Sequence, residues 1–376
     1  MIMDLITVRV ADVNDVPHLA WAKGLEVSLP FFVAEDLGCV ESRRLSITPA
    51  TLLEAATAVD DVRLRAAFTA RPPASSRLPL SYQRVPLPMR TLIGHVIGRI
   101  NRVRVRSWAT FPRWPLDLSA DLVADLCGGE RSAFSDAPTP VLLSHDIDTD
   151  EGLRNLVERF LPIEASVCAQ SSNYVVPCAW SIDHGLLGEV VRRGHEIGVH
   201  GYDHSNQTPF LDSSERRRRL SAARPFMERY AVIGYRAPSL LRTAALLEDL
   251  AQLYRYDSSI PTSGGLFPVP NNGCASARPF RIGGLVEIPV TMPRDGSLRF
   301  LGHNPRQIYA IWKECAERIS ASGGIVSLLT HCEERFSGNA GMLAVYKEFL
   351  EHLATDRRFA FFSPLQILHL LGSATS

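Results

Sequence analysis

Two histidines and two aspartates are spaced in ways that suit a metal site. His200 and His204 lie four residues apart in the segment HEIGVHGYDH. If the backbone after a short buried strand curls through a helical turn, both imidazoles project to one side and could share one ion. Asp146 and Asp148 end an apolar strand, VLLSHDIDTD, where alternation points both carboxylates the same way. One carboxylate could complete a metal site that stays open to water and substrate, with the other as a base.

Other proteins use parts of this pattern. Two histidines at this spacing also serve packing or capping. The run DIDT is similar to the motif of aspartyl-phosphate phosphatases, but Asp150 stands where that class has Thr or Val. Glycosyltransferases also use DxD, to hold a metal and a sugar nucleotide. Neither class explains the histidine pair.

The elements that must position these residues alternate regularly from Val141 onward. Strands are expected at Val141–His145, Ile163–Cys168, Glu196–His200, Val232–Arg236, Arg255–Ser258, Leu285–Val290 and Ile325–Thr330. Helices are expected at Gly152–Phe160, His184–Arg193, Ser214–Tyr230, Ala244–Leu253, Pro305–Ser320 and Met342–Leu353. This alternation predicts an α/β fold with a parallel sheet, open or closed into a barrel, covered by helices. Ligands of such sheets bind beyond the carboxyl ends of the strands, which is where Asp146, Asp148, His200, Arg236 and His331 fall.

Four motifs, in this order, give the chain a family resemblance. They are SHDID, GHEIGVHGYDH, YRAP at 235–238 and SLLTH at 327–331. Together they resemble the polysaccharide deacetylases with the NodB homology fold, carbohydrate esterase family four, over roughly Pro140 to the C-terminus. The resemblance implies a distorted barrel of seven or eight strands.

The resemblance also implies a role for each motif residue. Asp148, His200 and His204 would hold one divalent metal, with zinc expected first and cobalt, manganese, nickel or iron as alternatives. Asp146 would be the base, Arg236 would pair with it, and His331 would protonate the departing amine. The family usually has TFDDG where this chain has SHDID, so Ile147 separates the base from the metal ligand.

Several further residues are candidates for supporting or substrate contacts. Asp257 and Asp295 follow later strands, and either could orient His331 or line the sugar site. Tyr235 and Pro238 belong to the YRAP motif. His145 replaces the usual Phe, and we expect the pleat to turn it away from the metal. Cys332 follows His331, and we expect a buried thiol rather than a ligand. The segment Pro261–Arg278, rich in Gly, Pro and Asn, could form a rim of the substrate site.

The N-terminal third carries no strong catalytic signal. A stretch rich in Gly, Ser and Pro near 127–140 predicts a boundary, with an accessory α+β domain at 1–135 and the barrel at 136–376. Short strands are expected near Leu5–Val10 and around Ser46, and a helix at Pro49–Ala67. The segment Pro86–Arg106 is amphipathic and basic. We expect it to cover the barrel with its polar face solvated, with peripheral membrane contact as the alternative.

The composition of the chain limits its possible partners and its cellular compartment. The chain of 376 residues has 40 basic and 40 acidic side chains, so no overall field attracts nucleic acid. Its first residues are unlike a secretory signal, and no apolar run is long enough for a transmembrane helix. Seven cysteines without a CxxC pair favour reduced thiols. We therefore expect a cytoplasmic protein.

These features together predict an enzyme. We expect a metal-dependent hydrolase that removes an N-acetyl group from an amino sugar in a glycan or glycan precursor. A cytoplasmic setting favours a lipid- or nucleotide-linked precursor, because relatives that trim peptidoglycan or chitin are commonly exported. The alternatives are a hydrolase of another small amide or ureide, and a catalytically silent glycan-binding module.

Overall fold

The computed structural model describes residues 5–9, 26–30, 72–73, 76, 87–108, 114–118, 121, 134, 137–263 and 273–373. For 5–9, 26–30 and parts of 87–108 it describes the backbone alone. The expected strand around Ser46 and the helix at Pro49–Ala67 lie outside these residues. The proposed boundary between 135 and 136 also lies outside them, so the division into two domains stays a prediction.

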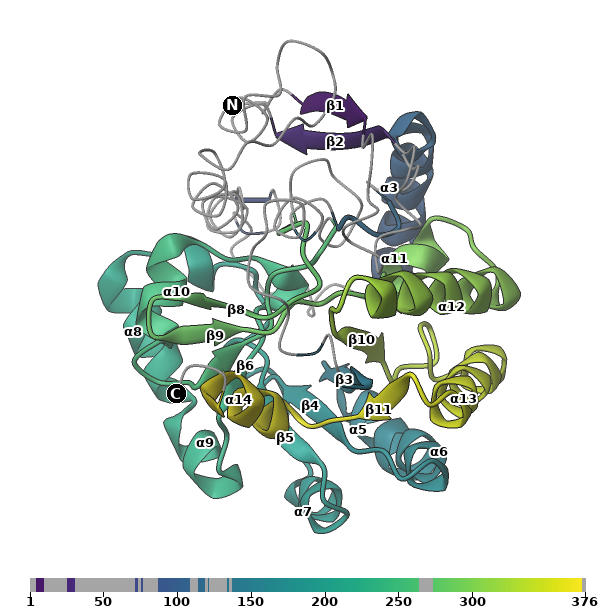
Figure 1. Ribbon diagram of the computed structural model, residues 1–376. Coiled ribbons are helices and arrows are strands. Elements are labelled where there is room, and N and C mark those ends of the chain that lie inside the picture. The colour runs from purple at the N-terminus through teal and green to yellow at the C-terminus, as the bar shows by residue number, and fades with distance from the viewer. Residues whose placement is uncertain are drawn as a thin grey trace.

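A curled, mostly parallel sheet forms the centre of the molecule (Figure 1). Its nine strands run in the order β10-β3-β4-β5-β6-β7-β9-β8, and β11 pairs with β3. The strands are β3 (Thr139–Ile147), β4 (Ser171–Val175), β5 (Glu196–Val199), β6 (Gly234–Tyr235), β7 (Tyr256–Asp257), β8 (Phe280–Ile282), β9 (Leu285–Glu287), β10 (Val326–His331) and β11 (Phe359–Phe361). The pair β8 and β9 is antiparallel, and the other paired strands of this sheet are parallel.

The two ends of this sheet approach each other. The backbone N–H of Met292, beyond β9, donates to the carbonyl of Ser327 in β10 at 3.1 Å. Thr291 Oγ1 donates to the carbonyl of Ile325 at 2.8 Å and accepts from the N–H of Ser327. The sheet therefore curls into a distorted barrel, and the expected α/β barrel class is confirmed.

Helices pack around the sheet (Figure 1). They are α5 (Asp150–Asn155), the π-helical turn η4 (Leu156–Phe160), α6 (Leu161–Ser166), α7 (His184–Arg192), α8 (Ser213–Ala222), α9 (Arg224–Tyr230), α10 (Ala244–Leu250), α11 (Asp295–Phe300), α12 (Pro305–Ala321), α13 (Ala340–Thr355) and α14 (Pro364–Ser373). Two 3₁₀ turns, η5 (Thr208–Phe210) and η6 (Pro238–Leu240), follow β5 and β6. Strands β1 (Leu5–Arg9) and β2 (Glu26–Pro30) form a separate antiparallel pair.

Helix α12 shows how sequence signals produce these elements. Asn304 caps its first turn through a reciprocal capping box with Gln307, and Pro305 occupies the first turn as expected. Ile308, Trp312 and their neighbours at helical spacing are buried. That apolar stripe packs into the large core between helices and sheet.

Two expectations about the elements were wrong, and several elements were missed. The segment Ile163–Cys168 is not a strand, because most of it continues the preceding helix as α6, and the strand is β4. The expected helix Ser214–Tyr230 is divided into α8 and α9 near Pro225, since proline interrupts the helical hydrogen bonds. Strands β8 and β11 and helices α11 and α14 were not expected.

Helix α3 (Leu87–Trp108) departs from the expected arrangement in the face that it exposes. It packs on α11 through glycines, because a Cβ added at Gly98 would lie 2.2 Å from the carbonyl oxygen of Phe300. The apolar side chains of Met89, Leu92, Ile93, Val96, Ile97, Ile100 and Val103 are exposed. The solvated polar face that the sequence predicts is therefore accompanied by an exposed apolar face, which was not expected. Within the described ranges we find no helix with the length and hydropathy that a bilayer crossing requires.

Candidate active site

Three potential metal ligands meet at the carboxyl ends of β3 and β5. The ligand atoms of Asp148, His200 and His204 all lie within 4.8 Å of one another. Asp148 Oδ1 is 3.6 Å from His200 Nε2 and 3.5 Å from His204 Nε2. A carboxylate oxygen and two imidazole nitrogens suit a borderline divalent cation. The three residues that the sequence groups as metal ligands are thus close together and face one another.

The backbone between the two histidines is not the helical turn that the sequence suggested. Residues 201–206 form irregular bends, with Gly201 at φ 69° and His204 at φ 57°. A Cβ on Gly201 would also lie 2.5 Å from Cδ of Pro238. Glycine therefore meets two requirements at once, the left-handed backbone and the close approach of Pro238. Pro238 supports the loop between the two histidines.

Hydrogen bonding presents His200 as a ligand. Its Nδ1 lies 3.0 Å from the carbonyl oxygen of Arg236, so Nδ1 carries a proton and Nε2 keeps its lone pair. Burial lowers the pKa of His200, against the opposing effect of Asp146 and Asp148. The neutral imidazole with a free Nε2 is the form that binds a metal ion.

Asp146 forms a buried ion pair with Arg236. Arg236 Nη1 donates to Asp146 Oδ1 at 3.0 Å, and both side chains are almost fully buried. Ser144 and Ser258 accept further hydrogen bonds from the guanidinium, which lies 4.0 Å from the ring centroid of Tyr174. Burial alone would raise the pKa of Asp146, but His200 and Arg236 lower it to about 2. Asp146 is therefore ionised, and its Oδ2 faces His200 Nε2 at 3.6 Å.

His331 is held by Asp295. His331 Nδ1 is 2.9 Å from Asp295 Oδ1, and Asp295 Oδ2 accepts from the His331 backbone N–H and from Ser337 Oγ. Burial alone would lower the pKa of His331, but Asp295 and the more distant Asp146 and Asp148 raise it to about 9. Since β10 pairs His331 with Asp146 in register, the imidazolium lies beside the candidate base. Its Nε2 remains available to give a proton.

Asp257 and Tyr235 do not take part in this arrangement. Asp257 accepts a hydrogen bond from Ser259 Oγ at 2.7 Å and shares another with Glu287, so Asp295 is the acid that contacts His331. Tyr235 packs in the main core with its ring 5.2 Å from that of Tyr254. The pleat that turns Arg236 toward Asp146 turns the ring of Tyr235 into the core, and a supporting role for Tyr235 stays a prediction.

His145 and Cys332 lie behind the site. His145 is fully buried between Thr330 Oγ1 at 2.8 Å and Glu164 Oε1 at 2.7 Å. The prediction that it points away from the metal ligands is confirmed. Cys332 is a buried residue of the main core, and burial raises the pKa of its thiol well above the usual value.

The sequence did not single out two residues near the site. Glu333, in HCEE, accepts from Thr149 Oγ1 at 2.8 Å and so connects β10 to the loop after Asp148. Burial and the nearby Asp148 raise the pKa of Glu333 to about 7. Arg294 lies next to Asp295 and is also buried. The one feature of the sequence that could have pointed to Glu333 and Arg294 is that they lie close along the chain to His331 and Asp295.

This distorted barrel, with polar residues gathered at its carboxyl edge, is the fold of the polysaccharide deacetylases. A protein from Mycobacterium smegmatis, named as a polysaccharide deacetylase, is 22% identical with a TM-score of 0.50, over 64% of this chain and 92% of that chain. A second, from Pseudomonas aeruginosa PAO1, is 14% identical with a TM-score of 0.51, over 69% of this chain and 98% of that one. The Puue allantoinase is 15% identical with a TM-score of 0.50, over 69% and 98%.

These similarities confirm the family resemblance at the level of the fold. No sequence family matches the chain. No curated protein matches it in sequence either.

Proposed function

We propose that the protein is a metal-dependent hydrolase that removes an N-acetyl group from an amino sugar in a glycan or glycan precursor. The observation that carries this proposal is the cluster of Asp148, His200 and His204 beside the Asp146–Arg236 pair and the His331–Asp295 pair. A base, a metal site and an acid at one edge of a barrel suit hydrolysis of an amide.

Asp148, His200 and His204 would hold the divalent ion, for which zinc is the first candidate and cobalt, manganese, nickel and iron are alternatives. When bound, such an ion would lower the pKa of water toward ~7 and polarise the acyl carbonyl. The donor set fits this role, because His200 Nε2 is freed by the hydrogen bond from Nδ1 to Arg236.

The protein's own groups would move the protons. Asp146, kept ionised by Arg236, takes a proton from water as the oxygen adds to the acyl carbon. His331, protonated and oriented by Asp295, gives a proton to the nitrogen as the C–N bond breaks. The products are acetate and a free amine. Positioning of the base and the acid next to the reacting group would contribute on the order of 10²–10⁴-fold for each proton transfer.

The acid role of His331 predicts a particular dependence on pH. Because Asp295 helps raise the pKa of His331 to about 9, the protonated form persists at neutral pH, and kcat/KM should fall as pH rises through about 9. Asp295→Asn removes the charge that contacts His331, so this alkaline limb should move to lower pH. Asp257→Asn is the matched control and should leave the limb in place. An alkaline limb that is the same in Asp295→Asn and the wild type would contradict the acid role.

The cellular compartment of the protein bears on which substrate we propose. The five described cysteines form no disulfide among themselves, which suits a reducing compartment. A cytoplasmic enzyme of this kind would act on a precursor sugar, lipid-linked or nucleotide-linked, rather than on finished polymer.

A second candidate function is hydrolysis of a small amide or ureide. It is favoured by the similarity in fold to the Puue allantoinase. Two assays on the same sample test both candidates, together with its metal content. One measures acetate release from N-acetylated sugars and their nucleotide-linked forms, and the other measures turnover of ureides. Acetate release that requires the metal supports the deacetylase. Ammonia or ureide turnover without acetate release favours the second candidate, and no turnover of either class favours a silent glycan-binding module.

We also propose that α3 makes peripheral contact with an anionic membrane. Leu92, Val96 and Val103 are at least half exposed, and the exposed Arg99 and Arg102 lie on the same helix. The protein should sediment with phosphatidylglycerol vesicles more than with phosphatidylcholine vesicles. Val96→Glu should weaken this binding, and Val191→Glu, at an exposed apolar position on α7, should not. Equal sedimentation of Val96→Glu and wild type would rule out α3 as the contact.

A further inference from the structure

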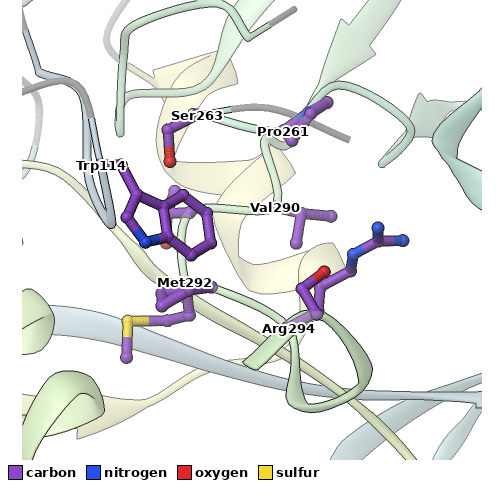
Figure 2. A pocket seen from close by; sticks show the side chains of 9 residues that line it. Trp114, Pro261, Ser263, Val290, Met292 and Arg294 are labelled. Atoms are coloured by element: carbon purple, nitrogen blue, oxygen red, sulfur yellow. The ribbon is translucent and has the colours of Figure 1, made fainter. Parts of the chain in front are cut away.

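The carboxyl edge of the barrel is filled beyond β9. There Trp114, Val290 and Met292 line a hollow (Figure 2) that has room for about one water molecule, which is too small for a sugar ring. A different part of the same edge is formed by the loop after β5, residues 201–207. This loop carries the candidate metal ligand His204, and its conformation decides where that ligand points.

His204 has no hydrogen bond that holds its ring. Its Nε2 faces Asp148 Oδ1 at 3.5 Å, and its Nδ1 is buried without a hydrogen-bond partner among the described residues. His200 differs, since its Nδ1 is bonded to the carbonyl of Arg236. A histidine that binds a metal commonly donates its second ring N–H in that way, which fixes the direction of the ring. The direction of the His204 ring therefore depends on the backbone that carries it.

This backbone has a conformation that needs support. His204 has φ 57° and Asn206 has φ 63°, in the left-handed region that a Cβ disfavours. The Ser205 N–H donates to Asp203 Oδ1 at 3.0 Å, which closes a tight turn around His204. Residues in such conformations persist where their surroundings hold them in place. The turn therefore needs contacts from outside the loop.

Arg219, in helix α8, supplies such contacts. Its Nη1 donates to Ser205 Oγ at 3.0 Å and lies 3.5 Å from Asp203 Oδ1. One nitrogen thus reaches both neighbours of His204. The other terminal nitrogen, Nη2, donates to Gln207 Oε1 at 3.0 Å. A single guanidinium therefore connects the turn to the end of the loop.

The guanidinium of Arg219 is itself fixed. Its Nε donates to Glu215 Oε1 at 3.2 Å, one turn earlier in α8, and its Cζ lies 5.2 Å from the ring centroid of Tyr202. The Arg219 side chain is only 12% exposed, whereas that of Arg217 is 70% exposed and pairs with Asp249. Because the guanidinium is planar and held at Nε, it presents Nη1 and Nη2 to the loop in one direction.

We propose that Arg219 is a positioning residue for His204. It keeps the loop 201–207 in the conformation that turns the His204 imidazole toward Asp148 and His200, and so it raises the affinity of this site for its divalent ion. Lysine does not replace it, because an ammonium lacks the planar pair of donors. This inference rests on the proposed function for the assignment of the metal, but zinc affinity tests it without any substrate.

Zinc binding to the metal-free protein, measured by competition with a chelating dye, tests the proposal. Arg219→Met should weaken zinc affinity by roughly 10- to 100-fold, the usual effect of losing a group that orients a ligand. Arg219→Lys should lose most of this affinity too. Arg217→Met is the matched control on the same helix, where Asp249 stays paired with Arg216, and it should bind zinc like the wild type.

Two results separate positioning of the ligand from support of the fold. Unchanged zinc affinity in Arg219→Met, with a lower Tm of the metal-free protein, would show that Arg219 supports the fold only and would overturn the proposal. The second result comes from the His204→Ala background, with its weaker zinc binding measured by calorimetry. There Arg219→Met should change the affinity by no more than about 2-fold, because its effect passes through His204.

A further loss in that background, as large as in the wild type, would show that Arg219 acts on another part of the site and would overturn the proposal. Failure of the wild type to bind zinc would overturn both the proposal and the proposed function. Zinc affinity that depends on Arg219, in a protein that releases no acetate, would refute the deacetylase function and leave the role of Arg219 standing.

Discussion

His200→Ala is expected to abolish binding of the divalent ion and to lower kcat/KM for acetate release by roughly 10⁴-fold or more, since the activation of water by the metal is lost. His200 occupies the centre of the site, with Nε2 at 3.6 Å from both Asp146 and Asp148. Its ring is held by the hydrogen bond from Nδ1 to the carbonyl of Arg236 at 3.0 Å, which directs Nε2 toward the two carboxylates. Metal content by mass spectrometry and acetate release on the same sample measure the two effects.

The control for this variant is another histidine changed in the same way. His184 begins α7 and contacts Tyr230 at the surface. His184→Ala should keep the full metal content and activity. If His200→Ala retained one equivalent of metal, Asp148, His200 and His204 would not form the site, and the proposed function would lose its foundation.

The location of the site could be predicted from the sequence because parallel strands impose it. Once Asp146, His200 and His331 are assigned to the ends of parallel strands, the topology brings them to one edge of the sheet. The strands that carry them, β3, β5 and β10, are apolar and buried. The strand pattern of these segments could therefore be recognised in the sequence. The alternation along β3 correctly placed His145 on the opposite face from Asp146.

Features that depend on tertiary contacts could not be predicted from the sequence. Strand β4, SSNYV, looks polar, but all five of its residues are buried, and the Ser171 backbone N–H donates to His195 Nδ1 at 3.0 Å. The choice between Asp257 and Asp295 as partner of His331 required the position of α11, which no local pattern predicted.

Asp146→Asn is expected to lower kcat by roughly 10²–10⁴-fold while metal content stays unchanged, because an amide cannot accept the proton of the attacking water. Asparagine has nearly the same shape and can still accept a hydrogen bond from Arg236 Nη1, so substrate binding should change little. The measurement is kcat and KM for acetate release, with metal content on the same protein. Asp257→Asn, an equally buried acid that contacts Ser259 rather than the site, is the matched control and should remain close to wild type.

The same variant should also reduce stability, for a reason separate from catalysis. Within the described residues, Asp146 is the carboxylate that pairs with Arg236, and both side chains are almost fully buried. Breaking such a pair costs about 3–5 kcal/mol of unfolding free energy. The double variant Asp146→Asn/Arg236→Met removes the uncompensated charge and should recover part of that loss without recovering activity. Urea unfolding of the wild type and the three variants of this cycle separates the two roles. If Asp146→Asn lost stability but kept kcat, Asp146 would be a partner of Arg236 only, and the base would have to be another group at this edge of the barrel.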